Sequence, residues 1–173
     1  MKVLLFAILY IFLFTGCSSK SLEQVFIEKS NEQKVDYKIM MSICKHESGF
    51  KEYAINVNKS IFNIQKGPHF FDSRFFANVY MDTILDPLFL SYDVGICQIN
   101  NQHLDRFNLD NEDLLDIEHN IEVATKIYKY NINKCKNDVI CALSMYNTGK
   151  RKSEIGKKYA KKVLRMKSKM FKN

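Results

Sequence analysis

One carboxyl group, that of Glu47, ends an apolar helical stripe and is the best candidate for acid–base chemistry. Four apolar residues recur before it at helical spacing, namely Ile39, Met40, Ile43 and Cys44. The spacing predicts that the Glu47 side chain faces the packed side of a helix that ends at Ser48-Gly49. Burial raises the pKa of a carboxyl group, as a general acid near neutral pH requires. The simpler interpretation is a surface glutamate at a helix end.

Three further segments follow Glu47-Ser48-Gly49 in order. They are Asp93-Val94-Gly95-Ile96-Cys97-Gln98-Ile99-Asn100, Tyr146-Asn147-Thr148-Gly149 and Tyr159-Ala160-Lys161-Lys162-Val163. In this order the segments resemble the signatures of the lytic transglycosylases of the lysozyme-like superfamily, which are Glu-Ser-Gly, Gly-x-x-Gln-Ile, Tyr-Asn-x-Gly and Tyr-x-x-Lys-Val. The resemblance covers about residues 34–164. Residues 54–59 and 91–93 look most like the branch that accompanies secretion and conjugation machines.

The resemblance implies a substrate and a mechanism. Such enzymes cleave the bond between N-acetylmuramic acid and N-acetylglucosamine in peptidoglycan, and Glu47 would donate the proton. The ionised glutamate would then take the proton of the muramic acid C6 hydroxyl, which closes a 1,6-anhydro ring without water. The substrate-binding residues implied are Ser48, Gln98, Asn100, Tyr146, Asn147 and Tyr159. Ser48 would also support the helix end, and the two tyrosines would line the cleft and tune Glu47, or only pack as aromatics.

Asp93 leaves two chemistries open. An Asp two residues before this Gly is also how animal-type lysozymes present a second carboxylate, and a retaining hydrolase needs its two carboxyl groups about 5 to 5.5 Å apart. Asp93 is interpreted first as a turn or sheet stabiliser, next as a substrate contact and last as a nucleophile. The first prediction is a transglycosylase, because the Tyr146-Asn147-Thr148-Gly149 segment and the Tyr159 helix resemble that family. The alternatives are a muramidase that uses Glu47 with Asp93 and a non-catalytic peptidoglycan-binding lipoprotein.

The N-terminus resembles an export signal. Lys2 precedes the apolar run 3–14, which is short for a membrane span and reads as a secretory signal over residues 1–16. Phe14-Thr15-Gly16-Cys17 resembles a bacterial lipobox, so Cys17 is predicted to carry a lipid. The serines after it carry no acidic retention signal, which favours the periplasmic face of the outer membrane. The alternative is ordinary signal cleavage without lipid.

The other four cysteines would lie in a compartment that permits disulfides. Cys135 and Cys141 flank a predicted turn between two helices, where a bond would fix the helix that delivers Tyr146. Cys44 and Cys97 stand beside the Glu47 and Gln98 motifs and would either bond or act as small buried apolar residues. The sequence alone does not exclude other pairings.

Residues 35–173 are expected to form one mainly helical α+β domain of lysozyme-like fold, with a small sheet or extended turn beside the catalytic helix. Residues 17–34 form an anchor segment with a short helix. Residues 91–99 are expected to pair with 53–57 in the sheet, and Asp116 and Asn120 are candidate caps. The helices are predicted at 22–33, 36–47, 72–85, 120–131, 138–146 and 156–170.

Residues 60–90 form an insertion that is longer than the resembled family usually needs. Phe76, Val79, Tyr80 and Thr83 share a helical stripe within it. Three interpretations are a satellite helix packed on the core, a lid over the cleft and a docking surface for an envelope protein.

Charge is concentrated at the C-terminus. Residues 150–173 hold eleven Lys or Arg and one Glu, a net charge of +10, against +7 for the whole chain. An amphipathic closing helix with a solvated basic face is the first interpretation, and an anion-binding patch is the second. The expected partners are glycan strands, a membrane through the lipid, and a secretion, pilus or flagellar apparatus, with no nucleic acid. The four histidines lack metal-site spacing, so no metal or cofactor is expected.

Overall fold

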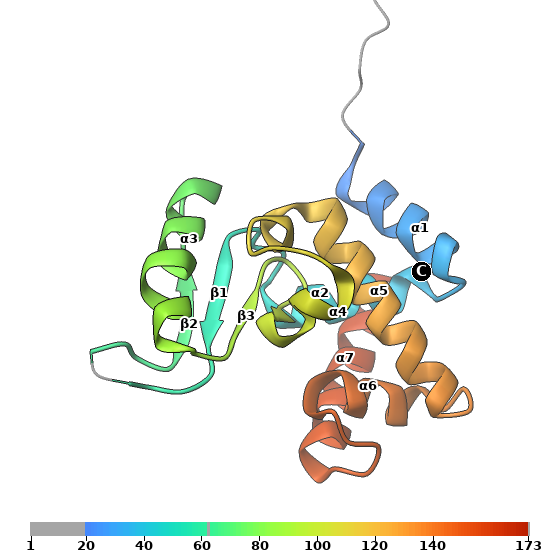
Figure 1. Cartoon of the computed structure of the whole chain (residues 1–173). Coiled ribbons are helices and arrows are strands. Elements are labelled where there is room, and N and C mark those ends of the chain that lie inside the picture. The colour runs from blue at the N-terminus through green and yellow to red at the C-terminus, as the bar shows by residue number, and fades with distance from the viewer. Residues whose placement is uncertain (1–19, 62, 173) are drawn as a thin grey trace, which may run out of the picture.

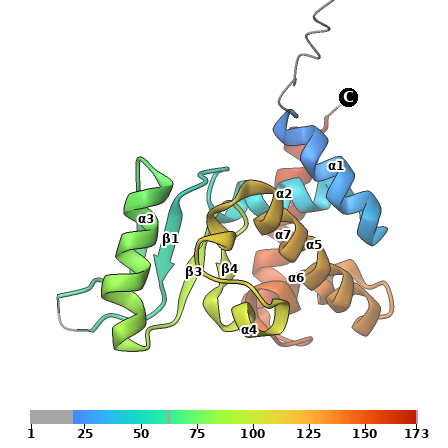
Figure 2. The ribbon, with the colours of Figure 1, turned by 45° about the horizontal axis from the view of Figure 1, so that its top comes forward.

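The computed structural model describes residues 20–61 and 63–172. A group of helices lies beside a smaller part that contains a sheet and helix α3, as Figures 1 and 2 show from two directions. The fold is mainly helical with one small antiparallel sheet, which confirms the predicted lysozyme-like α+β class. The predicted signal and the Cys17 lipid site lie outside the described residues.

The helical part contains α1 (Leu22–Gln33), α2 (Tyr37–Glu47), α5 (Ile117–Lys134), α6 (Val139–Thr148) and α7 (Glu154–Met170). An acidic or hydroxyl side chain caps each N-terminus, namely Ser21, Asp36, Asp116, Asp138 and Ser153. Helix α5 begins three residues earlier than predicted because Asp116 is its cap and accepts the His119 N–H at 2.9 Å. The interpretation of Asn120 as a cap is wrong.

The sheet has the strand order β2-β1-β3-β4, and all neighbours are antiparallel. Its strands are β1 (Ala54–Val57), β2 (Gly67–Phe70), β3 (Tyr92–Val94) and β4 (Ile99–Asn100). The pairing of β1 with β3 was expected from the sequence, whereas β2 was not. Gly67-Pro68 disfavours a strand by its composition. However, β2 pairs only with β1 and is an edge strand, and an edge strand tolerates proline because one side of its backbone needs no hydrogen-bond partner.

The predicted insertion supplies β2 and a helix that packs on the sheet. Helix α3 (Arg74–Tyr80) continues into a π-helical turn at Met81–Leu85 and a 3-10 turn at Asp86–Leu88. Its buried side chains are Ala77, Met81 and Leu85, whereas the stripe that begins at Phe76 and Val79 faces outward. The helix packs on the core, as the prediction of a satellite helix states. The face that makes this contact is not the predicted stripe.

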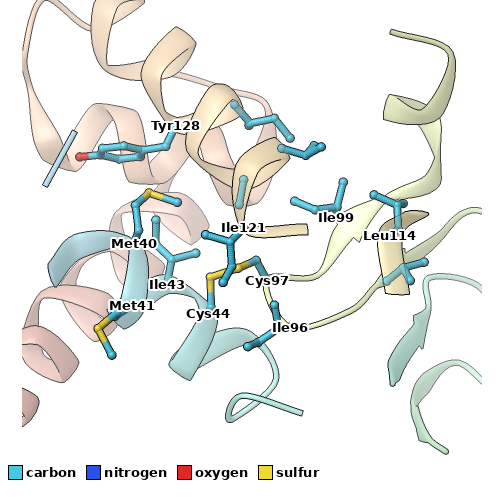
Figure 3. Close-up of a cluster of buried hydrophobic side chains, with 14 of the residues drawn as sticks. Met40, Met41, Ile43, Cys44, Ile96, Cys97, Ile99, Leu114, Ile121 and Tyr128 are labelled. Atoms are coloured by element: carbon cyan, nitrogen blue, oxygen red, sulfur yellow. A yellow bond between two sulfur atoms is a disulfide. The ribbon is translucent and has the colours of Figure 1, made fainter. Parts of the chain in front are cut away.

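The core surrounds α2. Figure 3 shows Met40, Ile43 and Cys44 of α2 pointing toward Ile121 and Tyr128 of α5. All four residues of the predicted α2 stripe are buried, and so are four residues on one side of α5, namely Ile121, Ala124, Thr125 and Tyr128. Burial of these two stripes fixes the rotation of α2 about its axis and therefore the direction in which its last residue points.

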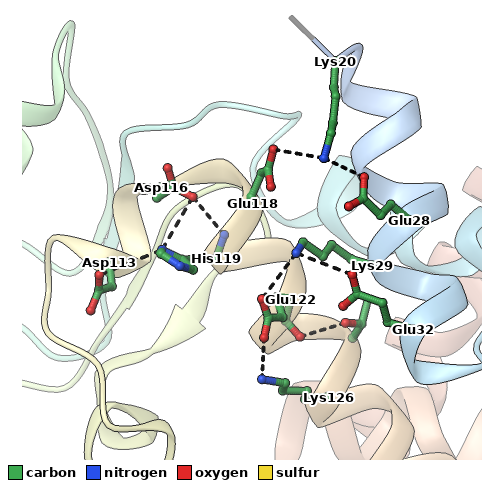
Figure 4. A network of polar contacts seen from close by, with 11 residues as sticks. Lys20, Glu28, Lys29, Glu32, Asp113, Asp116, Glu118, His119, Glu122 and Lys126 are labelled. Carbon is green, nitrogen blue, oxygen red and sulfur yellow. Dashed lines mark hydrogen bonds and ion pairs between the residues drawn. The ribbon is translucent and has the colours of Figure 1, made fainter.

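Ion pairs add to the apolar contact between α1 and α5 (Figure 4). Lys29 Nζ lies 3.5 Å from a Glu122 carboxylate oxygen, and Lys20 Nζ lies 3.9 Å from one of Glu118. The Lys20–Glu118 pair is exposed and contributes little. Val25 and Phe26, which are buried, supply the apolar attachment of α1.

Helix α7 is amphipathic, as predicted. Gly156, Tyr159, Ala160 and Val163 are buried, and its exposed side carries most of the C-terminal lysines. Lys167 Nζ lies 2.6 Å from an Asp36 carboxylate oxygen, which joins this helix to the N-terminus of α2. Within the described residues, no helix has both the length and the apolar character needed to cross a membrane.

Candidate active site

A cleft of about 880 Å³ separates the sheet from the ends of α4 (Leu104–Phe107), α5 and α6. Side chains from both sides line it, and most of them are polar. The predicted site residues that line it are Glu47, Asp93, Gln98, Asn100, Tyr146 and Asn147. Glu47 and Asn147, which are 100 residues apart in the sequence, thus line the same cleft, as the family resemblance implies.

Glu47 is the last residue of α2. The backbone turns away directly after it, because Gly49 has a φ of +70° and Ser48 caps the helix. The Ser48 hydroxyl donates to the Ile96 carbonyl at 2.7 Å and accepts the Lys51 N–H at 3.1 Å. Ser48 does not line the cleft. Its bonds support a positioning role, holding the end of α2 against the turn that follows β3, and not the predicted sugar contact.

The Glu47 carboxyl group has the electrostatics of a general acid. Burial raises its pKa to about 7, the hydrogen bond from Tyr159 opposes that rise, and the negative charge of Asp93 adds to it. Near neutral pH the group therefore exists in both protonation states. A carboxyl group with this pKa can donate a proton and later accept one, which is the property that acid–base catalysis at one residue needs.

Tyr159 of α7 controls that pKa from behind the cleft. Its hydroxyl donates to Glu47 Oε1 at 2.5 Å, and the residue is only 6% exposed. It is absent from the cleft lining, so the expectation that Tyr159 lines the cleft does not hold, whereas the expected contact with Glu47 is present. Burial, with the Glu47 charge, raises the pKa of Tyr159 well above its usual value, which keeps the hydroxyl a donor.

Tyr159→Phe is expected to move the alkaline limb of the pH–kcat/KM profile to higher pH. In the natural protein the hydrogen bond from Tyr159 stabilises the ionised form of Glu47. Without this bond the pKa of Glu47 rises above about 7. Tyr146→Phe is the matched control, because that hydroxyl donates to the Cys97 carbonyl at 3.1 Å and not to Glu47. An unshifted limb in Tyr159→Phe would contradict this role.

Gln98 lies in a tight turn at the floor of the cleft, with a φ of +53°. Its side-chain amide donates to the carbonyls of Ala54 at 3.1 Å and Gly95 at 2.9 Å. One amide hydrogen therefore joins the turn to β1, and the other bonds within the turn itself. The side-chain oxygen makes no hydrogen bond within the described residues, so Gln98 can offer a ligand an acceptor.

Asn120 is the site-building residue that the sequence interpretation missed. It is 1% exposed, and its amide donates to the carbonyls of Val94 at 2.9 Å and Leu114 at 2.7 Å. Its oxygen accepts the Cys97 N–H at 2.9 Å. Asn120 thereby holds the 94–97 turn from beneath. A single asparagine near a helix start resembles a cap, and no local pattern distinguishes the two roles.

A disulfide joins Cys44 of α2 to Cys97 of the turn, as Figure 3 shows. Both residues are fully buried. The two cysteines therefore form a disulfide and also pack in the apolar core, so both alternatives considered from the sequence apply. The bond lies one helical turn before Glu47 and one residue before Gln98. With the Ser48 hydrogen bond to Ile96, it gives two attachments between α2 and the turn, and the Tyr146 hydrogen bond joins the same turn to α6.

Helix α6 brings Tyr146 and Asn147 to the cleft. The second disulfide, Cys135–Cys141, joins the end of α5 to the start of α6. At the other end of α6, Gly149 adopts a φ of +68° and ends the helix. Asn147 is exposed in the cleft, where its amide is accessible to a ligand.

Asp93 lies within a bracket of amides on the sheet side of the cleft. Asn100 Nδ2 donates to Asp93 Oδ1 at 2.7 Å, and Asn56 Nδ2 donates to Oδ2 at 3.3 Å. These bonds cross from β3 to β4 and to β1. They support the interpretation of Asp93 as a sheet stabiliser that also faces the substrate. Asn100, a predicted substrate residue, is engaged in the same bracket.

No group of three or more His, Cys, Asp or Glu residues able to hold a metal ion occurs in residues 20–61 and 63–172. A polar cleft lined by an acid of raised pKa fits an enzyme that cleaves glycosidic bonds by proton transfer. The model of the transglycosylase SLT domain family matches residues 24–168, so the chain belongs to that family. Membership indicates lytic transglycosylase activity on peptidoglycan. No curated protein matches the chain.

Proposed function

We propose that this protein cleaves the β-1,4 bond between N-acetylmuramic acid and N-acetylglucosamine and leaves 1,6-anhydromuramic acid ends. The observation that carries the proposal is the pKa of the Glu47 carboxyl group, which is about 7. At neutral pH this group can donate a proton and, once ionised, accept one. It faces the same cleft as Gln98 and Asn147. Family membership supports the substrate class, and the chemistry of the residues supports the mechanism.

Glu47 performs both proton transfers. The protonated carboxyl donates to the glycosidic oxygen as the bond from the muramic acid anomeric carbon breaks. The resulting carboxylate then removes the proton of the C6 hydroxyl, whose oxygen attacks the anomeric carbon and closes the anhydro ring. The proton count returns to its starting value, and no water is consumed. Gln98 and Asn147 orient the sugar or its N-acetyl group by hydrogen bonds.

The second candidate is a hydrolase that uses Asp93 as its nucleophile. Asp93 lies close enough to Glu47 for its charge to raise the pKa of that group, which is the observation that favours this reading. The two amides that bond both Asp93 oxygens favour the transglycosylase, because an engaged carboxylate is a weaker nucleophile.

Asp93→Asn separates the two chemistries. We expect the variant to keep activity within about tenfold, since Asp93 supplies only electrostatic and positioning effects. Mass spectrometry of digested sacculi is expected to show anhydro ends, lighter by one water than reducing ends, for both the natural protein and the variant. Reducing ends from the natural protein, lost in Asp93→Asn, would establish the hydrolase. No release by either protein would leave a non-catalytic peptidoglycan-binding lipoprotein.

We further propose that the protein acts in the bacterial periplasm, anchored to the outer membrane by a lipid on Cys17. The support is the lipobox-like Phe14-Thr15-Gly16-Cys17. The resemblance of residues 54–59 and 91–93 to the secretion-associated branch supports a role beside an envelope-spanning machine. Palmitate labelling of the full chain, compared with Cys17→Ser, tests the anchor, and labelling of both proteins alike would refute it.

A further inference from the structure

Two cations gather around one aromatic ring at the helical end of the cleft. The Arg106 guanidinium carbon of α4 lies 4.9 Å from the centre of the Tyr130 ring, and Lys134 Nζ of α5 lies 4.7 Å from the same centre. All three residues line the cleft, and Tyr130 is 41% exposed. We call them the Tyr130 cation cluster. The ring holds both charges in place by cation–π attraction.

Neither cation of the cluster has an acidic partner among the described residues. No carboxylate oxygen there lies within 4 Å of Arg106 or Lys134, whereas Lys29, Arg74 and Lys167 each have one. Lys134 is the largest cause of a lowered pKa of Tyr130, and the charges of Arg106 and Arg151 act in the same direction, as a positive local potential would. The cluster is therefore prepared for an anion that the folded chain does not supply.

The cluster belongs to the same cleft as the acid. His103 of the 3-10 turn Asn101–His103 also lines the cleft, and its pKa is lowered by burial and by Arg106 while Asp93 opposes the decrease. His103 thus lies within electrostatic reach of both the Asp93 bracket and Arg106. A strand bound across Glu47 and extended along this wall would reach the cations.

The sugar rings of a glycan strand are neutral, so binding them does not explain two unpaired cations in the cleft. The anionic groups of peptidoglycan that recur along the strand are the carboxylates of the peptides attached to the muramic acid. We propose that Arg106, Tyr130 and Lys134 bind a peptide carboxylate of the substrate strand, so that the enzyme prefers glycan that still carries its peptides. This inference rests on the proposed function and names the part of the substrate that the cleft recognises. Arg106 suits this role because its planar fork can bond both carboxylate oxygens.

The test compares two substrates prepared from the same sacculi, one with its peptides and one from which an amidase has removed them. Because the amidase leaves a free lactyl carboxylate on each muramic acid, these carboxyl groups are then capped as methylamides. The full chain in detergent is compared with Arg106→Gln/Lys134→Gln. We expect the double variant to lose about tenfold in kcat/KM on the peptide-bearing strands, which is the value of about one charge-assisted hydrogen bond. Turnover of the peptide-free strands is expected to stay unchanged.

The matched control is Lys129→Gln, which removes a charge from the same helix at a position outside the cleft lining. It should leave both rates unchanged. A loss of equal size on both substrates in the double variant, or no loss on either, would overturn the proposal. A natural protein that releases no anhydro ends from either substrate would instead refute the proposed function, so the two failures are distinguishable.

A second measurement needs no variant. Amidation of the peptide carboxyl groups removes their charge and leaves the peptides in place. The natural protein should then lose its preference for peptide-bearing strands, and added salt should weaken that preference for unmodified peptides because exposed charges are screened. A preference that survives amidation would show that the peptides are bound without their carboxylates and would overturn the proposal.

Discussion

Glu47→Gln is expected to abolish release of anhydro-muropeptides and, at the same time, to stabilise the folded protein at neutral pH. The substitution removes the only group that transfers protons in the proposed mechanism, and glutamine keeps the size and the acceptor oxygen that faces Tyr159. General acid–base groups contribute about 10² to 10⁴ in rate. Because Glu47 acts in both steps, the loss should reach at least about 10³-fold.

The expected gain in stability follows from the raised pKa. A carboxyl group whose pKa rises from its usual value of 4.5 to about 7 on folding stabilises the folded state fully only below pH 4.5, and that contribution is lost as the pH rises through 7. The loss at pH 7 amounts to roughly 3 kcal/mol. Glutamine does not ionise, so the variant avoids it.

Thermal unfolding from pH 4 to 8 measures this effect. The natural protein and Glu47→Gln should have similar stability at pH 4, and the variant should become the more stable one as the pH rises. Glu23→Gln, at an exposed position on α1, is the matched control and should follow the natural protein at every pH. Retained activity in Glu47→Gln would remove the catalytic assignment, and a variant less stable at pH 7 would show that burial does not strain this carboxyl group.

The sequence predicted the helical part of the site well because its signals are local. Apolar residues at a period of 3.6 give both the existence of α2 and the side of it that is buried, and the direction of Glu47 follows from them. The turn at Ser48-Gly49 likewise depends on the conformations of adjacent residues, which their types determine.

Features that depend on distant contacts were less predictable. Strand β2 follows from its pairing with β1 across a 9-residue connection and not from its own composition, which contains Gly67 and Pro68. Tyr159 was linked to Glu47 by resemblance, but its position behind the cleft depends on how α7 packs against α2. The Tyr130 cation cluster joins Tyr130 and Lys134, four residues apart on α5, to Arg106 of α4, which no spacing in the sequence relates to them.

Asn120 and Gly95 form a pair whose meaning only the fold reveals. Gly95 has a φ of +79°, and a Cβ atom built on it would lie 2.3 Å from Asn120 Nδ2 and 2.5 Å from the Leu114 carbonyl oxygen. The asparagine amide occupies the space that a side chain would take, because it must reach the Val94 and Leu114 carbonyls. Glycine is therefore required by close approach as well as by backbone conformation.

Gly95→Ala is expected to destabilise the protein by about 3 kcal/mol or more and to reduce activity. The added methyl group displaces Asn120 and leaves buried polar groups unpaired, each at a cost of about 1 to 3 kcal/mol. The left-handed backbone adds about 1 kcal/mol. Because the same turn carries Cys97 and Gln98, its displacement also moves a proposed sugar-binding residue and the attachment of α2.

Urea unfolding of Gly95→Ala beside Gly149→Ala measures the contribution of that close approach. Gly149 has a similar φ of +68°, but a Cβ there would meet nothing within 4 Å, so alanine should cost only the backbone strain of about 1 kcal/mol. The difference between the two variants therefore reports the close approach of Asn120 and of the Leu114 carbonyl to Gly95. Equal losses would show that the turn yields without breaking those contacts, and that Asn120 does not fix the floor of the cleft.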